Sequence, residues 1–339
     1  MSLSRICVLT CLMLAAIFTA RGVNAALTGN LYSAEVPVLE KSPEEKTRGA
    51  ALALAEVLVK MSGDRRIAEH PAAAPLLASA EDYVQQFRFT PNDTLLVGFD
   101  GRNLQRAMRE ARLPVWGNDR PATLLWLAVD FGGGERRLLS ADDHGEVRTQ
   151  IEAAAAARGV PLIWPLNDST DRASLTVADV WGGYSGMVDE ASVRYAPDAI
   201  LVGRISRSSN GSYFGNWHLQ LQGEHKEWRD GLGDSVHRLS DYYAVRLASV
   251  ATTQDNAMVS MLISGLDDGR AYIHALSTLE KLGAIESVQV REARGSTVRV
   301  NLKLRGSADQ LRRSLGFSRV LVPDTDRDSA EFFNYRYAR

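Results

Sequence analysis

Residues 124–129 read Leu-Leu-Trp-Leu-Ala-Val, and this nearly continuous apolar stretch decides the expected fold. A strand that is hydrophobic on both faces is typical of the middle of a sheet with helices on either side. Helices and strands alternate after it: a helix from about Glu146 to Arg158, a strand from Pro161 to Leu166, a helix that closes at Ser192–Ala196 and a strand from Ala199 to Gly203. This order predicts a parallel sheet with covering helices.

Two further strands are expected at the edge of this sheet. Tyr213–Leu221 and Glu227–Gly231 are typical of antiparallel strands, and the helix that follows has a three-four apolar spacing from Val236 to Val250. Residues 121–255 are therefore predicted to form a middle α/β unit with a mixed sheet.

Residues 26–120 predict an N-terminal α+β unit. A half-buried strand begins at Leu31, and the helix after it has Ser42 as its cap, Pro43 in its first turn and Gly63 as its stop. A second helix from Glu81 to Phe87, a strand from Thr94 to Phe99 and a helix from Asn103 to Ala111 complete the unit.

The C-terminal residues 256–325 predict a third unit with the order βαββαβ, which is the ferredoxin-like arrangement. Alternating apolar residues at Val298, Val300, Leu302 and Leu304 mark its clearest strand. Residues 326–339 are expected to form a tail. The fold class is thus α/β and α+β in three small units.

The first 25 residues have the pattern of a cleavable signal peptide. Arg5 precedes an uncharged run from Ile6 to Ala20, and small residues follow up to Ala25. The run is shorter than the roughly 20 apolar residues that a membrane-spanning helix needs. We expect cleavage near Ala25, a periplasmic location and no transmembrane segment in the mature chain.

Composition narrows the possible functions. Both cysteines, Cys7 and Cys11, lie in the leader, so the mature chain would have neither a disulfide nor a cysteine metal site. The chain has 39 basic and 41 acidic residues and a net charge of −2, which argues against nucleic-acid binding. No cofactor is indicated.

No set of catalytic residues is apparent. The histidines are scattered without the spacing of metal ligands on one helix face, so no metal site is expected. Gly183-Tyr184-Ser185-Gly186 resembles a nucleophile elbow, but Met187 stands where its second glycine belongs. If the chain were an enzyme, its catalytic residues would have to be carboxylates such as Asp179 and Asp198.

The most unusual segment is Asp179-Val180-Trp181-Gly182-Gly183-Tyr184. It combines aromatic side chains, which often anchor interfaces, with a glycine pair and a carboxylate. The alternative is that Trp181 fills a core. Trp116 beside Gly117 leaves the same two interpretations open. The candidate interaction surface comprises Trp116, Asp179, Trp181, Gly182, Gly183 and Tyr184.

Several segments resemble an uncharacterised family of secreted proteobacterial proteins, domain of unknown function 2066. They are Leu31–Pro37, Ala55–Gly63, Leu113–Gly117, Val177–Gly183 and Arg194–Arg204, in which Ala196-Pro197 departs from the family pattern. The resemblance implies a location in the cell envelope and supplies no catalytic residues.

These observations predict a non-enzymatic periplasmic protein that acts as an adaptor or assembly factor and binds an envelope protein partner. A periplasmic hydrolase of cell-wall or envelope material is one alternative. A small-ligand receptor, with an apolar pocket between the first two units, is another.

Overall fold

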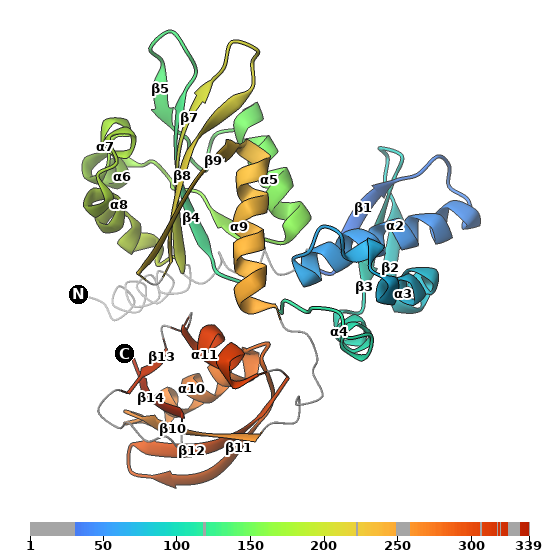
Figure 1. The fold of residues 1–339 in the computed structure, drawn as a ribbon, viewed down its shortest axis with the longest axis vertical. Coiled ribbons are helices and arrows are strands. Elements are labelled where there is room, and N and C mark those ends of the chain that lie inside the picture. The colour runs from blue at the N-terminus through green and yellow to red at the C-terminus, as the bar shows by residue number, and fades with distance from the viewer. Residues whose placement is uncertain are drawn as a thin grey trace, which may run out of the picture.

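The computed structural model describes residues 31–117, 120–221, 223–248, 258–305, 307–316, 318, 320–324 and 333–338. The expected signal peptide lies outside these residues. The described chain contains three sheets, each with its own hydrophobic core (Figure 1). The prediction of a mixed α/β and α+β fold is confirmed.

The first unit is a three-stranded antiparallel sheet of order β1-β3-β2 with helices against one face. Its elements are β1 Ser33–Pro37, α2 Pro43–Ser62, the short 3-10 helices η2 Ile67–Glu69 and η3 Pro71–Ala73, α3 Ala74–Ala78, η4 Ala80–Tyr83, β2 Val84–Phe89, β3 Thr94–Phe99 and α4 Gly101–Glu110. Ser42 accepts a hydrogen bond from the Glu45 amide, and Gly63 ends α2 with φ 73°. Both helix boundaries therefore follow from their capping residues.

The helix expected over Glu81–Phe87 is wrong. The chain makes one 3-10 turn and then forms β2, which pairs with β3 as an antiparallel hairpin. Pro91, Asn92 and Asp93 lie between the two strands, and Asp93 has a positive φ of 52°. A Pro-Asn-Asp turn before a strand is a hairpin signal, and it overrides the weak helical pattern before it.

The middle unit contains a mixed sheet of order β5-β4-β7-β8-β9, with β6 paired to β4. Its elements are β4 Thr123–Asp130, β5 Arg136–Leu138, α5 Glu146–Arg158, β6 Leu162–Ile163, α6 Ser169–Ser174, α7 Val177–Gly182, α8 Ser185–Ser192, η5 Val193–Tyr195, β7 Ala199–Arg207, β8 Tyr213–Leu221, β9 Glu224–Gly231 and α9 Leu232–Leu247. β4 is an interior strand, parallel to β6 and β7, as its apolar sequence predicts.

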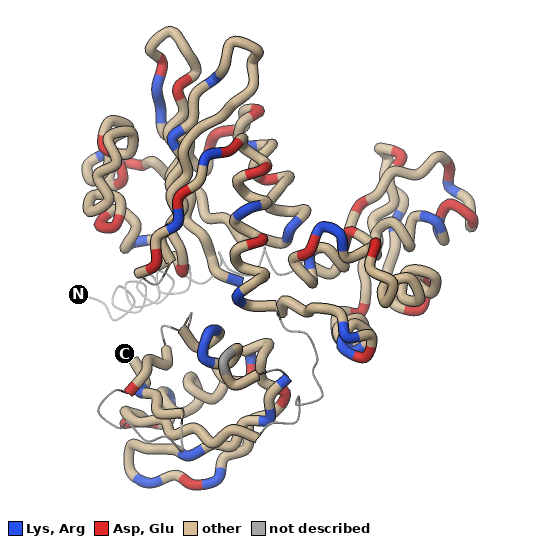
Figure 2. Tube along the Cα trace, viewed as in Figure 1, with Lys and Arg blue, Asp and Glu red and all other residues tan. Residues whose placement is uncertain are grey.

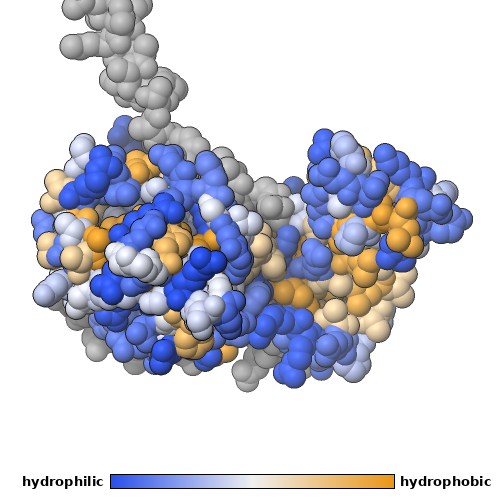
Figure 3. Space-filling model, turned by 90° about the horizontal axis from the view of Figure 1, so that it is seen from above, coloured by the Kyte–Doolittle hydropathy of each residue, from blue (hydrophilic) through white to orange (hydrophobic). Residues whose placement is uncertain are grey.

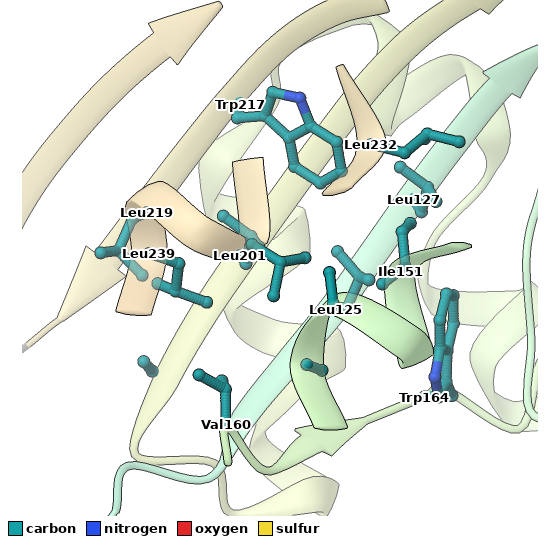
Figure 4. Close-up of a cluster of buried hydrophobic side chains, with 14 of the residues drawn as sticks. Leu125, Leu127, Ile151, Val160, Trp164, Leu201, Trp217, Leu219, Leu232 and Leu239 are labelled. Carbon is teal, nitrogen blue, oxygen red and sulfur yellow. The ribbon is translucent and has the colours of Figure 1, made fainter. Parts of the chain in front are cut away.

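Helices cover both faces of this sheet. α5 and α9 pack on one face over Leu125, Leu201 and Trp217, and Figure 4 shows this core. The group α6 to α8 lies on the other face, over Trp126 and Leu124 at β4 (Figure 1). Strands β8 and β9 extend beyond helices α6 to α8. On this face of the sheet their side chains are mostly polar and are exposed or half-buried.

The third unit has a five-stranded sheet of order β11-β12-β10-β14-β13. Its elements are β10 Met258–Ser264, α10 Gly269–Lys281, β11 Ile285–Arg294, β12 Thr297–Leu304, α11 Ala308–Gly316, β13 Leu321–Pro323 and β14 Phe333–Tyr337. The predicted βαββαβ order is present. Residues assigned to a tail, however, form β14, which lies between β10 and β13 and is parallel to β10.

Two arginine side chains join the first unit to the middle unit. Arg120 donates to the carbonyl oxygens of Lys60 at 2.6 Å and Gly159 at 2.9 Å, near the C-terminal ends of α2 and α5. Arg158, only 1% exposed, donates to the Gly63 carbonyl at 2.7 Å. Helix C-terminal carbonyls carry partial negative charge, so both guanidinium groups are stabilised there.

Candidate functional site

A hollow with a volume of about 290 Å³ lies on the face of the middle sheet that carries α6 to α8. We call it the arginine pocket. Its lining residues come from β7, β8 and β9, from the turn between β7 and β8, and from α7, and they are Trp181, Arg204, Ser206, Ser208, Phe214, Gly215, Asn216 and Arg229. Figure 3 views the end of the molecule where β5 and the β7–β8 hairpin lie, and shows small hydrophobic areas surrounded by hydrophilic ones.

Strand register aligns three polar residues across this face. Arg204 of β7 lies opposite Asn216 of β8, and Asn216 lies opposite Arg229 of β9. Directly paired residues project to the same face of a sheet, so an amide lies between two guanidinium groups. Ser206 and Phe214 form the next pair along these strands. We call Arg204, Asn216 and Arg229 the arginine row.

Alternation along β7 explains why Arg204 lies on this face. Leu201, Gly203 and Ile205 are buried toward α5 and α9, which leaves Val202 and Arg204 on the opposite side. Val202 packs with the core beneath α7 and α8. Arg204 lies nearer the C-terminal end of β7 and is half-buried.

Trp181 reaches the pocket because α7 is fixed at both ends. Thr176 and Asp179 form a reciprocal capping box at its start, and Gly183 ends it with φ 81°. The Arg136 guanidinium carbon lies 4.3 Å from the centre of the Trp181 ring, a cation–π contact. A half-buried tryptophan thus forms one wall.

The glycine pair lets the end of α7 approach the arginine row closely. A Cβ atom on Gly183 would lie 2.9 Å from Arg204 Nη1, and one on Gly182 would lie 2.6 Å from the Tyr184 ring. Tyr184 itself is 60% exposed. The structure therefore brings Trp181, Gly182, Gly183 and Tyr184 together beside the pocket.

The remaining predicted site residues, Asp179 and Trp116, stabilise the fold and do not line the pocket. Asp179 is occupied in the capping box, where hydrogen bonds from the Thr176 hydroxyl and amide lower its pKa. Trp116 is 1% exposed, beneath the Arg120 guanidinium at 3.9 Å and beside Tyr243 at 6.1 Å. The expectation that Trp116 belongs to an exposed interaction surface is wrong, because it fills the junction between the first two units.

Positive charge dominates the arginine pocket. Among the described residues, neither Arg204 nor Arg229 forms an ion pair within 4.0 Å, and no carboxylate lines the hollow. Arg229 lies 5.2 Å from the centre of the Phe214 ring. Guanidinium groups, an amide and two hydroxyls together favour the binding of an oxyanion.

A histidine pair lies in the adjacent rows of the same face. His218 Nδ1 is 3.0 Å from Glu227 Oε1, and His218 Nε2 is 3.1 Å from His225 Nδ1. The pKa of the Glu227 carboxyl is lowered, first by the hydrogen bond from His218 and also by the charge of Arg204. Within the described part of the chain, no group of metal-ligating side chains has the geometry of a metal site.

A second hollow, of about 330 Å³, lies between the N-terminal ends of α5 and α9. Its lining residues include the carboxylates of Glu146 and Asp234 and the imidazole of His237. This hollow is lined by carboxylates, whereas the arginine pocket is lined by guanidinium groups. The two hollows therefore favour ligands of opposite charge.

Sequence reasoning missed the arginine row. Arg204, Asn216 and Arg229 belong to no local motif, and they become neighbours only through the register of β7, β8 and β9. The one available signal was the alternation of polar and apolar residues along β7 and β8.

Comparison with known families gives one match, to a domain of unknown function, DUF8605, over residues 25–117. This finding corrects the resemblance to domain of unknown function 2066. No protein with a curated description matches the chain significantly. The matched residues cover the described first unit and end at Gly117, so the arginine pocket lies outside them. The chain thus contains a segment similar to this uncharacterised domain.

Proposed function

We propose that the chain is an exported, non-enzymatic protein of the periplasm, an adaptor or assembly factor that holds an acidic envelope component in the arginine pocket. The observation that carries this proposal is the arginine row, where two guanidinium groups that form no ion pair within 4.0 Å among the described residues lie beside the exposed Tyr184 and the half-buried Trp181. Aromatic and arginine side chains together are the usual anchors of binding surfaces.

The leader sequence supports export, and the described residues include no helix with the length and apolarity needed to cross a bilayer. Basic and acidic residues are interspersed over the described chain (Figure 2), which shows no continuous basic block of the kind that binds nucleic acid. A local cationic pocket on a mixed surface is suited to one acidic group of a partner.

The hydrolase alternative loses its named carboxylates. Asp179 caps α7, and Asp198 accepts a hydrogen bond from the Ala122 amide at 2.8 Å where β7 begins. The receptor alternative needs space between the first two units, where Arg120 and Trp116 are packed. The residues on which these two alternatives rest thus take part in structural contacts.

Cell fractionation followed by in-cell chemical crosslinking tests the proposal. We expect a mature chain that begins near Ala26 in the periplasmic fraction, and a crosslinked partner recovered with it. The double variant Arg204→Gln/Arg229→Gln should lose that partner, whereas Arg207→Gln should keep it, because Arg207 lies on the opposite face of β7. Full-length protein in the cytosol, or equal recovery from all variants, would contradict the proposal.

A further inference from the structure

We infer that the arginine pocket binds a phosphate monoester group, an inference that rests on the proposed function and names the chemistry of the bound component. Charge is the first argument. Arg204 and Arg229 line a hollow without a lining carboxylate, so two positive charges face one bound group. A phosphate monoester carries a charge of about −1.5 to −2 at neutral pH, whereas a carboxylate carries −1.

The acidic residues near the arginine row form their hydrogen bonds and ion pairs with other side chains. Glu227 acts on Arg204 from the adjacent row, but its carboxylate is hydrogen-bonded to His218. Asp230 follows Arg229 in sequence and pairs instead with Arg238, at 2.9 Å. The nearby acids are thus engaged by other cations or imidazoles.

Geometry is the second argument. Neighbouring strands lie about 4.8 Å apart, so the backbones of Arg204 and Arg229 are separated by roughly 10 Å across β8. Long arginine side chains can converge from both sides onto a group above Asn216. Three terminal phosphate oxygens accept hydrogen bonds from several directions, which suits two guanidinium forks and the Asn216 amide.

The walls define the rest of the ligand. Trp181 and Phe214 supply apolar surface beside the cations, so the group esterified to the phosphate should have an apolar or flat face. The volume of about 290 Å³ is at the small end for ligand pockets. The pocket is therefore sized for a phosphorylated head group, with the remainder of the ligand outside.

Isothermal titration calorimetry of the full mature chain with phenyl phosphate, inorganic phosphate and benzoate tests the inference. We expect phenyl phosphate to bind at least about tenfold more tightly than benzoate, because it gains one more charge-assisted contact. Arg204→Gln and Arg229→Gln should each weaken phenyl phosphate binding by about tenfold or more. Arg207→Gln, which removes the same charge on the opposite face of β7, should bind as the parent does.

Benzoate binding equal to that of phenyl phosphate would overturn the inference, as would unchanged binding by the two pocket variants with parental circular dichroism. Asn216→Leu, which keeps both arginines, should also weaken binding if the group lies over the row. Phosphatidylcholine vesicles with and without phosphatidic acid distinguish the source. Co-sedimentation that the pocket variants lose assigns the phosphate to a lipid, and phenyl phosphate binding without co-sedimentation assigns it to a soluble ester.

These outcomes are separable from those of the proposed function. Loss of the in-cell partner from Arg204→Gln/Arg229→Gln, together with no preference for phenyl phosphate, would leave the binding function in place and reject phosphate as the recognised group.

Discussion

The Arg120 side chain stabilises the junction of the first two units through hydrogen bonds to backbone carbonyl oxygens. Its guanidinium donates to the carbonyl oxygens of Lys60, Trp116, Gly117, Arg158 and Gly159 and covers the Trp116 ring. Burial lowers the pKa of Arg120 to about 9, so the group remains charged at neutral pH. Its contribution comes from the number and direction of its hydrogen bonds.

Arg120→Ala should therefore lower the free energy of unfolding by about 3 kcal/mol or more, because buried carbonyls lose their donor. Arg120→Lys should recover little of this loss, since an ammonium lacks the planar fork. Urea denaturation gives both values, with Arg102→Ala on the exposed side of α4 as the control, expected within about 0.5 kcal/mol of the parent. A loss below about 1 kcal/mol for Arg120→Ala would contradict this role.

Tyr243 gives the junction a dependence on alkaline pH. Its side chain is fully buried, its hydroxyl is 2.8 Å from Thr123 Oγ1, and burial raises its pKa. The unfolded tyrosine ionises near pH 10 while the folded one stays neutral. The stability that Tyr243 contributes is thus complete below pH 10 and is lost as the pH rises above it.

Tyr243→Phe should flatten the fall in unfolding free energy between pH 9 and pH 11, by up to about 1.4 kcal/mol per pH unit. Tyr195, whose pKa burial and its hydrogen bond to Asp171 raise to about 12, should maintain part of the slope in the variant. Denaturation at a series of pH values measures the two slopes, and equal slopes would rule out this effect of Tyr243.

The two tryptophan–glycine segments show what a single sequence could and could not predict. Trp116-Gly117 and Trp181-Gly182 have the same local pattern, yet one tryptophan is buried at a junction and the other lines a pocket. The difference depends on partners outside each local pattern, Tyr243 and Arg120 for Trp116 and Arg136 for Trp181. Local residue types carry no information about those contacts.

At the scale of elements, helix ends and strands with strong patterns were predictable. The start of α2 at Ser42, the stop of α5 at Gly159 and the strand Tyr213–Leu221 follow from caps and alternation. β14 could not be predicted, because its parallel pairing with β10 joins segments about 70 residues apart in the sequence. A five-residue strand at that separation has no local signature.

The short helix α7 determines the geometry of the pocket, because its C-terminal turn sets the distance to Arg204. Gly183→Ala places a side chain where φ is 81° and where Arg204 Nη1 would be 2.9 Å away. We expect a loss of about 1 kcal/mol in unfolding free energy. Phenyl phosphate binding should also weaken as Arg204 is displaced.

Gly186→Ala is the matched control for Gly183→Ala. Gly186 lies in α8, where a Cβ atom would meet nothing within 4 Å, and an alanine there should be neutral or slightly stabilising. Thermal unfolding and calorimetry measure both variants. Equal behaviour of the two alanine variants would show that the turn at Gly183 is unimportant for the pocket.

On the scale of the whole molecule, hydrogen bonds to helix C-terminal carbonyls join the units. Arg158 and Arg120 reach α2 from the middle unit, and Gln310 of α11 donates to the Leu247 carbonyl of α9 at 3.1 Å. The mixed α/β fold could be predicted from patterns along the sequence, but these contacts could not, because they depend on where helix ends meet. The arginine pocket is lined by residues of the middle unit, and α9 packs on the opposite face of the same sheet.

Site-specific photo-crosslinking in cells tests the central claim, that an envelope component binds at this face. A photoreactive residue replaces Tyr184, which is 60% exposed beside the pocket, or Val245, which is 83% exposed on α9. We expect a discrete crosslinked product from position 184 that disappears in Arg204→Gln/Arg229→Gln, and no such product from position 245. Absence of a product at position 184, or the same product from both positions, would contradict the claim.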